Sequence, residues 1–331
     1  MNSLVNSLRE SVKLVNLGEV SPLENDLNLY AKPKSQFAGV IPFSQHYVKP
    51  FSELDLSELS KSYSSMLDLA QKLGAKFVIC DAMLSISTLR AIFLETENKG
   101  NIIPRITLTE AGDIEGGATP LCALIIAQSL GARLFVIKPY SLENAVRTIS
   151  ELSHASKIPL ALDLSDLEDA SEEFDVITDG SISLDEADFL CLKQKDDEVR
   201  FYPCKAKFKR EAPKEDSFFL ASSSEGYIFD NEDYSIAPIL TTEIFDPKDI
   251  FFQQDSNYDI VNFYIKNMQF AESLATNSYL LTKPIYLTCD DEKALETALY
   301  YYKGVPLISR DSDIPEARLK ELTQKYGAVL I

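Results

Sequence analysis

The sequence is poor in the side chains that most often hold metals or build disulfide frameworks. It contains two histidines and five cysteines, and no two cysteines form a Cys-x-x-Cys pair. The cysteines are Cys80, Cys122, Cys191, Cys204 and Cys289. Their odd number, together with a start (MNSLVNSLRESV) that lacks the features of a signal peptide, predicts a cytoplasmic protein with reduced thiols.

Positive charge and long apolar runs are also scarce. Lys and Arg number 32 against 51 Asp and Glu, which gives a net charge of −19 and opposes phosphate backbones and anionic lipid. The short basic stretch KAKFKR is flanked by DDE and KED, so we interpret it as a solvated loop. No apolar run reaches the roughly 18–20 residues needed to cross a bilayer. We therefore expect neither a nucleic-acid nor a membrane partner.

What is present is a regular alternation of apolar strands and amphipathic helices. Strand patterns occupy residues 35–43, 76–83, 105–110, 133–139, 159–164 and 187–194, with helix patterns at 52–74, after Thr119-Pro120 and after Ser141. This alternation predicts parallel βα units, and hence an α/β fold with a TIM-type (β/α) barrel of mainly parallel strands. A closed barrel needs eight strands, and residues 1–34 are too short and polar for two βα units. We therefore expect the barrel to be incomplete or rearranged.

The chain changes character after residue 194. Residues 194–217 are charged and aperiodic, which indicates a linker or a surface excursion. We therefore divide the chain into a barrel segment, residues 1–205, and a smaller α/β segment, residues 206–331. In the smaller segment we expect a hairpin or strand at 217–230, strands at 236–246, 284–289, 305–309 and 327–331, and helices at 260–275, after Asp290-Asp291 and after Asp313.

The order of segments in the first part of the chain resembles that of a known family. Five stretches follow one another: FAGVIPF, FSELDLSELSKSYSSMLDLAQKLGAKFVICDAM, RITLTEAGDIEGGATP, QSLGARLFVIKPYSLENA and KIPLALDL. Their order is similar to that in the homocysteine S-methyltransferase family, which includes the homocysteine-binding module of cobalamin-dependent methionine synthase. The resemblance covers roughly residues 5–195. It implies a barrel that transfers a methyl group to a thiol acceptor in methionine biosynthesis.

The resemblance also implies a zinc ion held by cysteine thiolates at strand ends, and here the chain departs from the family. One ligand position falls at Lys138-Pro139, and the family's adjacent pair of cysteines falls at DFLCLKQ, which offers only Cys191. Proline has no donor atom and a protonated lysine repels Zn²⁺. We therefore expect no metal ligands and no stoichiometric zinc. His46 follows a strand end, so we keep two alternatives for it: a ligand or general base at the site, or no such role. His154 lies in the C-terminal turn of a helix.

The tail carries a second resemblance, to the methyltetrahydrofolate-binding barrel. APILTTEIFDPKD and KPIYLTCDDEKALETALYYYKGVPLIS resemble strands of that barrel, whose strand-end acids and amides hold the pterin. This implies substrate-binding roles for Glu243 and Asp246, with Thr288 and Ser309 at two further positions. We expect one long helix between Asp246 and Lys283, with no room for a further βα unit.

Strand-end side chains are the candidate site residues of the barrel. Asp81 and Lys138 are the candidate catalytic residues, and Asp163 and Glu110 are candidates for substrate binding, because equivalent ends of parallel strands meet at one face. We expect Lys138 to be buried and to pair with Asp81 or Asp163, since an unpaired ammonium in a poorly hydrated site is costly.

Three functions follow as alternatives. The first is a divergent homocysteine S-methyltransferase or methionine synthase relative, either active on a thiol acceptor or a non-catalytic subunit of such a system. The second is a catalytically silent α/β module that docks a corrinoid- or folate-carrying protein. The third is an unrelated α/β enzyme on a barrel scaffold. The residues themselves support no cofactor; zinc and cobalamin or methyltetrahydrofolate are implied by the resemblance alone.

Overall fold

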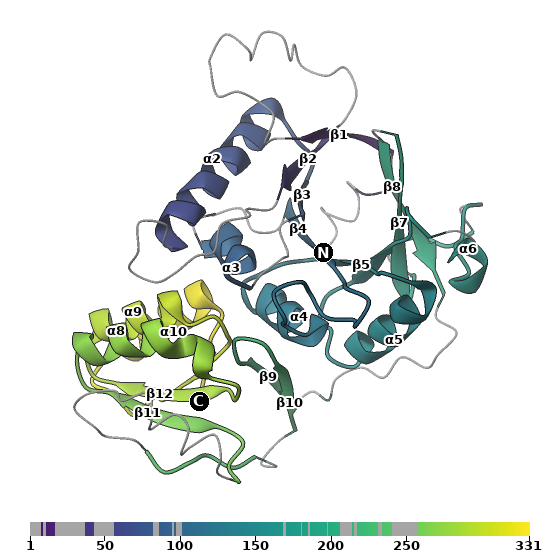
Figure 1. Ribbon diagram of the computed structural model, residues 1–331. Coiled ribbons are helices and arrows are strands. Elements are labelled where there is room, and N and C mark those ends of the chain that lie inside the picture. Colours follow the sequence, from purple (N-terminus) through teal and green to yellow (C-terminus); the bar gives the residue numbers. More distant parts are fainter. Residues whose placement is uncertain are drawn as a thin grey trace.

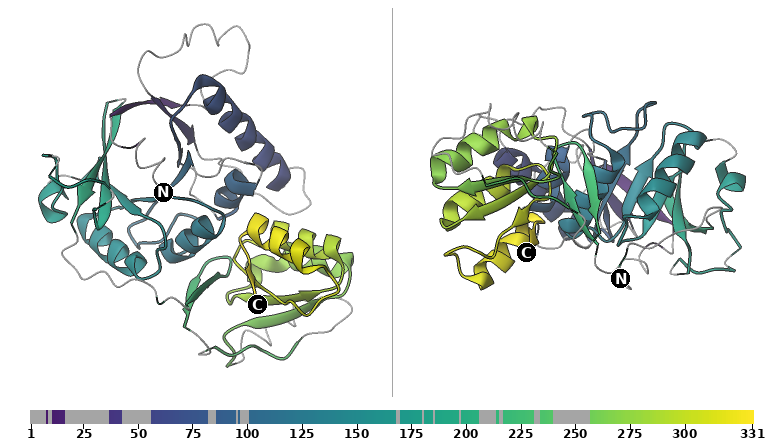
Figure 2. Two further views of the ribbon diagram at one scale, coloured as in Figure 1. Left: turned by 180° about the vertical axis from the view of Figure 1, so that it is seen from behind. Right: turned by 90° about the horizontal axis from the view of Figure 1, so that it is seen from below.

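The computed structural model contains a barrel, a hairpin and a four-stranded sheet (Figure 1). It describes residues 8, 11–16, 37–42, 56–81, 86–94, 96, 101–167, 170–179, 181–184, 186–196, 198–205, 214, 217–230, 234–239 and 257–331. The barrel and the four-stranded sheet with its helices lie side by side (Figure 2). No helix among these residues is long and apolar enough to cross a bilayer.

Eight strands close the barrel in chain order, which confirms the predicted TIM-like fold. They are β1 (Val12–Asn16), β2 (Phe37–Pro42), β3 (Val78–Asp81), β4 (Ile102–Thr107), β5 (Phe135–Lys138), β6 (Leu160–Asp163), β7 (Phe189–Lys195) and β8 (Glu198–Cys204). β1 to β7 are parallel, whereas β8 runs antiparallel to both β7 and β1.

Two of these strands correct the expectation of a barrel with six strands up to residue 194. β1 lies within residues 1–34, and β8 lies within residues 194–217, for which a linker or a surface excursion was expected. β8 alternates between exposed and buried residues along most of its length. Its charged, outward residues made the stretch resemble a loop, although its inward residues Val199 and Phe201 pack inside the barrel.

Helices cover the barrel wall in the pattern that the caps predict. They are α2 (Leu56–Leu73), α3 (Ile86–Leu94), α4 (Pro120–Ser129), α5 (Leu142–Ser153) and the short α6 (Ala170–Glu173). Thr119 accepts a hydrogen bond from the backbone N–H of Cys122, and Ser141 accepts one from that of Asn144, so both predicted N-caps are confirmed. His154 is the C-cap of α5.

Barrel strands alternate between two hydrophobic clusters. Ile79, Ile103, Val136 and Ala161 belong to the cluster inside the barrel. Their neighbours along the same strands belong to the larger cluster between the barrel wall and the helices. This period of two fixes which strand-end side chains face inward.

The second segment is a hairpin followed by a four-stranded parallel sheet with its helices. The hairpin pairs β9 (Phe218–Ala221) with β10 (Gly226–Phe229). The sheet consists of β11 (Val261–Ile265), β12 (Ile285–Cys289), β13 (Leu307–Ile308) and β14 (Val329–Leu330), all parallel and in chain order. The helices α8 (Met268–Asn277), α9 (Glu292–Tyr301) and α10 (Glu316–Tyr326) cover one face of it (Figure 1). We call the sheet and these helices the half-barrel.

The helix predicted over residues 260–275 is wrong. Its first part is β11, whose Phe263 and Ile265 are buried, and Asn267 then caps α8 by accepting a hydrogen bond from the backbone N–H of Phe270. The stretch therefore holds the βα unit for which we expected no room. The short apolar run of residues 260–265 fits the spacing of a strand as well as that of a helix. The N-cap residue Asn267 is the sequence feature that indicates where the helix begins.

The hairpin makes close backbone contacts with both the barrel and the half-barrel. A Cβ added to Gly226 of β10 would lie 2.8 Å from the backbone nitrogen of Cys122 in α4, and one added to Gly304 would lie 1.9 Å from the carbonyl oxygen of Ala221. Arg90 of α3 is 1% exposed. It donates hydrogen bonds to the backbone carbonyl oxygens of Leu299 and Tyr326, near the ends of α9 and α10. The two segments consequently share one continuous hydrophobic cluster.

Candidate functional site at the barrel mouth

Charged side chains gather at the C-terminal ends of β3 to β6, which we call the barrel mouth. Asp81, Lys138 and Asp163 are the last residues of β3, β5 and β6. Each follows an inward-facing residue by two positions, so each continues the inward row. This is the end of a parallel barrel at which enzymes of this architecture place their chemistry.

Arg105 of β4 holds two of these acids together. Its Nε donates to Oδ1 of Asp81 at 2.5 Å and its Nη2 to Oδ2 of the same carboxylate, while Nη1 donates to Oδ2 of Asp163 at 2.6 Å. β4 and β6 are separated by β5, so the second contact crosses the interior of the barrel. Burial lowers the pKa of Arg105, but its hydrogen bonds and charge contacts with Asp81 and Asp163 outweigh this and raise it above the ordinary value.

Asp163 is the buried end of this network. Its side chain is 1% exposed, against 31% for Asp81. Its Oδ1 accepts from the backbone N–H and the hydroxyl of Ser165, at 3.1 and 2.5 Å. The Ser165 hydroxyl oxygen in turn accepts from the backbone N–H of Gln194, at 2.8 Å. The network therefore ties β4, β6 and β7 together, and Asp81 is its solvent-facing carboxylate.

Lys138 does pair with an acid, but not with the expected one. Its Nζ lies 2.7 Å from Oδ2 of Asp166, in the loop after β6, and the two side chains are 32% and 68% exposed. The expectation of a buried Lys138 paired with Asp81 or Asp163 is therefore wrong. Arg105 occupies both of those carboxylates, and the lysine reaches outward to the next acid along the chain.

Glu110 is near the mouth but is not a strand-end residue. It is exposed and sits in a turn in which the N–H of Thr109 donates to the carbonyl of Asp113 at 2.8 Å. β4 ends at Thr107, so the strand predicted over residues 105–110 begins and ends too late. This difference in the strand's bounds also explains why Arg105 was not among the candidate residues. In the predicted strand Arg105 is the first residue, and it would therefore lie far from the mouth.

Three other candidates, His46, Glu243 and Asp246, lie outside the described residues.

The barrel mouth does not fit a thiolate-bound zinc ion. Cys191 is bonded to Cys204 across β7 and β8, and it belongs to the cluster outside the barrel rather than inside it. The thiol expected to be reduced is therefore paired. Lys138 stands at another ligand position of the family, with its ammonium bound to Asp166. Within the described ranges no three His, Cys, Asp or Glu side chains form a group that suits a metal.

The arrangement can instead bind a small ligand that carries both charges. Asp81 has carboxylate lone pairs beyond those used by Arg105, and Lys138 has two N–H donors beyond the one directed at Asp166. β3 and β5 are separated by one strand, so the inward side chains Asp81 and Lys138 stand on either side of Arg105. Comparison with known proteins adds no identity, since the sequence matches no family model and no curated protein.

Proposed function

We propose that this chain is a divergent relative of the homocysteine S-methyltransferases that binds an amino-acid ligand at the barrel mouth without zinc. The observation that carries the proposal is the inward row of Asp81, Arg105, Lys138 and Asp163 on four consecutive strands. A row of charges facing a barrel interior costs stability unless it is paired, and Lys138 is the member of this row whose partner, the exposed Asp166, lies outside it.

Each residue has a separate role in this proposal. Asp81 accepts the ligand's ammonium group and Lys138 donates to its carboxylate. Arg105 is a positioning residue, because it fixes Asp81 through two hydrogen bonds and is itself anchored on the buried Asp163. Asp166 competes with the ligand for Lys138 and is the more exposed partner, so a ligand carboxylate can displace it.

Binding is tested by calorimetry with L-homocysteine and two analogues, one without the amino group and one without the carboxylate. We expect Lys138→Met to lower the affinity for homocysteine roughly fivefold, because a half-exposed ion pair contributes about 1 kcal/mol. The affinity for the analogue without a carboxylate should not change. Asp81→Asn should show the reverse preference. Lys320→Met, which removes an exposed pair with Glu316 on α10, is the matched control and should change neither.

Turnover is read separately, as methionine formed from homocysteine and a methyl donor. Methionine formation would assign the chain as a methyltransferase, and binding without turnover would assign it as a non-catalytic subunit. If none of the three ligands binds to the folded protein, the proposal fails.

One observation favours the alternative of a silent assembly module for a corrinoid- or folate-carrying protein. Asp81 and Asp163, the two acids of the inward row, are both bound to Arg105, so the network is complete without a ligand. In that case Arg105→Met would lower stability but would not alter the binding of any small molecule.

A further inference from the structure

Ser165 holds the buried carboxylate of the barrel mouth from the side opposite to Arg105. Its backbone N–H and its hydroxyl both donate to Oδ1 of Asp163, at 3.1 and 2.5 Å. The other oxygen of this carboxylate, Oδ2, accepts from Nη1 of Arg105 at 2.6 Å. The side chain of Asp163 is 1% exposed, so water competes little with these donors. Ser165 and Arg105 together therefore fix the plane of the carboxylate.

The hydroxyl proton of Ser165 has a single direction. The hydroxyl oxygen accepts from the backbone N–H of Gln194 at 2.8 Å, and a backbone N–H can only donate. The carboxylate of Asp163, which is paired with Arg105, can only accept, so it receives the one proton of the hydroxyl. Gln194 is itself held in register, because it pairs with Val199 in the ladder of β7 and β8. The position of β7 consequently fixes the orientation of a carboxylate on β6.

Arg105 passes this constraint on to Asp81. A guanidinium is planar, so the direction of Nη1 determines the directions of Nε and Nη2. Nη1 binds Asp163, whereas Nε and Nη2 both bind the carboxylate of Asp81. A carboxylate of Asp163 that turned away from Arg105 would therefore also change how Asp81 is held. Asp81 is 31% exposed, against 7% for Arg105, so it is the member of this network that meets solvent.

We propose that Ser165 is a positioning residue of the barrel mouth, which sets the orientation of the Asp81 carboxylate through the two buried side chains between them. The inference rests on the proposed function, in which Asp81 binds the ammonium group of an amino-acid ligand. Lys138, which binds the ligand's carboxylate in that proposal, pairs with Asp166 and not with a member of this chain of contacts. Ser165 should therefore affect the binding of the ammonium end alone.

Calorimetry tests this with L-homocysteine and with the analogues that lack the amino group or the carboxylate. We expect Ser165→Ala to lower the affinity for homocysteine and for the analogue without a carboxylate about threefold, because Asp81 remains but is no longer held in one orientation. The affinity for the analogue without an amino group should not change. Ser165→Thr keeps the hydroxyl and should bind all three ligands like the wild type.

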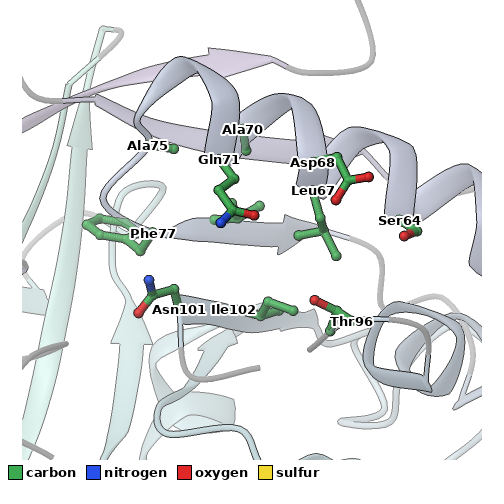
Figure 3. A pocket seen from close by; sticks show the side chains of 11 residues that line it. Ser64, Leu67, Asp68, Ala70, Gln71, Ala75, Phe77, Thr96, Asn101 and Ile102 are labelled. Carbon is green, nitrogen blue, oxygen red and sulfur yellow. The ribbon is translucent and has the colours of Figure 1, made fainter. Parts of the chain in front are cut away.

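Two control variants remove similar groups away from the mouth. Ser183 lies before β7, and like Ser165 it donates its backbone N–H and its hydroxyl to one carboxylate oxygen, that of Glu186, at 3.1 and 3.0 Å. Asn101 lies just before β4, at the opposite end of the strand that carries Arg105, and it lines a hollow below α2 (Figure 3). Ser183→Ala and Asn101→Ala should leave the affinities for all three ligands unchanged.

The Nε–H of Arg105 gives a measurement that needs no ligand. It donates to Asp81 at 2.5 Å from a side chain that is 7% exposed, so its NMR signal should be protected from exchange with solvent. The signal is assigned by its loss in Arg105→Met. We expect it to shift and to exchange faster in Ser165→Ala, but not in Ser165→Thr or in either control variant.

An unchanged Nε–H signal in Ser165→Ala, or affinities equal to those of the wild type, would overturn the inference and leave the proposed function intact. A loss of affinity that is the same for all three ligands would overturn it as well, since it would show a general loss of structure. If the wild type binds none of the three ligands, the proposed function fails and the inference fails with it.

Discussion

Replacing Arg90 tests whether the barrel and the half-barrel are held together by one buried cation. Arg90 lies in α3 and is 1% exposed. Its Nη2 donates to the carbonyl of Leu299 at 2.8 Å, and its Nη1 donates to those of Gly304 at 3.2 Å and Tyr326 at 3.4 Å. Leu299 and Tyr326 lie at the C-terminal ends of α9 and α10, where the helix dipoles are negative. Burial lowers the pKa of Arg90 to about 10, so the guanidinium remains charged at neutral pH.

The magnitude follows from the three contacts. A hydrogen bond to a charged group contributes about 1.5–3 kcal/mol, and only the contact with Leu299 has a short distance. Arg90→Met also leaves three buried carbonyls without this donor, at about 1–3 kcal/mol for each one that stays unsatisfied. Release of the guanidinium from a buried site offsets part of this loss. We expect a net loss of about 3 kcal/mol in the free energy of unfolding.

Urea unfolding measures this loss, and hydrogen exchange locates it. The backbone amides of α9 and α10 should exchange faster in Arg90→Met than in the wild type, while those of β3 to β6 should change least. Arg318→Met is the control, because Arg318 belongs to an exposed network with Glu292 and Glu321 and should cost less than about 1 kcal/mol. A loss in Arg90→Met no larger than that in Arg318→Met would refute the reasoning.

Three further changes probe other contacts. Gly304→Ala should destabilise the protein by about 2 kcal/mol or more in thermal unfolding, because its Cβ would lie 1.9 Å from the carbonyl oxygen of Ala221; an unchanged midpoint would contradict this contact. Burial raises the pKa of Glu296, but hydrogen bonds from Tyr326 and Lys325 outweigh it, so its folded pKa lies below the ordinary value. Glu296 therefore stabilises the folded protein above the ordinary carboxyl pKa, and this stabilisation is lost as the pH falls through the folded pKa. In Glu296→Gln, the free energy of unfolding should fall less steeply with decreasing pH than in the wild type. An equal pH dependence in the two proteins would contradict this. Thiol titration of the protein denatured without reductant should give three reactive thiols, those of Cys80, Cys122 and Cys289. Five reactive thiols would exclude the disulfide between Cys191 and Cys204.

The periodic middle of the chain was predictable because its strands are apolar and because α4 and α5 begin at side-chain caps. The wrong predictions have different physical causes. A strand buried on one face only carries charges on the other, so β8 has the sequence pattern of a linker or a surface excursion. β4 was placed too late because Pro104 interrupts its apolar run, and a proline inside a run usually argues against a strand.

The same reasoning explains how much of the candidate site the sequence could reveal. Asp81, Lys138 and Asp163 were identifiable because each ends an apolar strand. Arg105 was not, since nothing in its local sequence shows that two acids, 24 residues before it and 58 after it, converge on it. Pairing across a barrel interior depends on register and strand order, which no local pattern contains. The pairing of Lys138 with Asp166 was missed for the same reason.

The antiparallel β8 also gives the ring of strands a seam. Among the described residues, β8 forms seven residue pairs with β7 but two with β1, namely Val12 with Val199 and Lys13 with Glu198. Pairing β1 with β8 closes the long chain loop between Val12 and Val199, at an entropic cost of about 4–5 kcal/mol. The pairing of β7 with β8 closes only a short loop. The strands should therefore assemble first as an open sheet from β1 to β8, and the pairing of β1 with β8 should close the ring in the last step. In the folded protein the same seam should be the first part of the ring to open, and the amides at Val12 and Lys13 should exchange with solvent before those of β5 and β6.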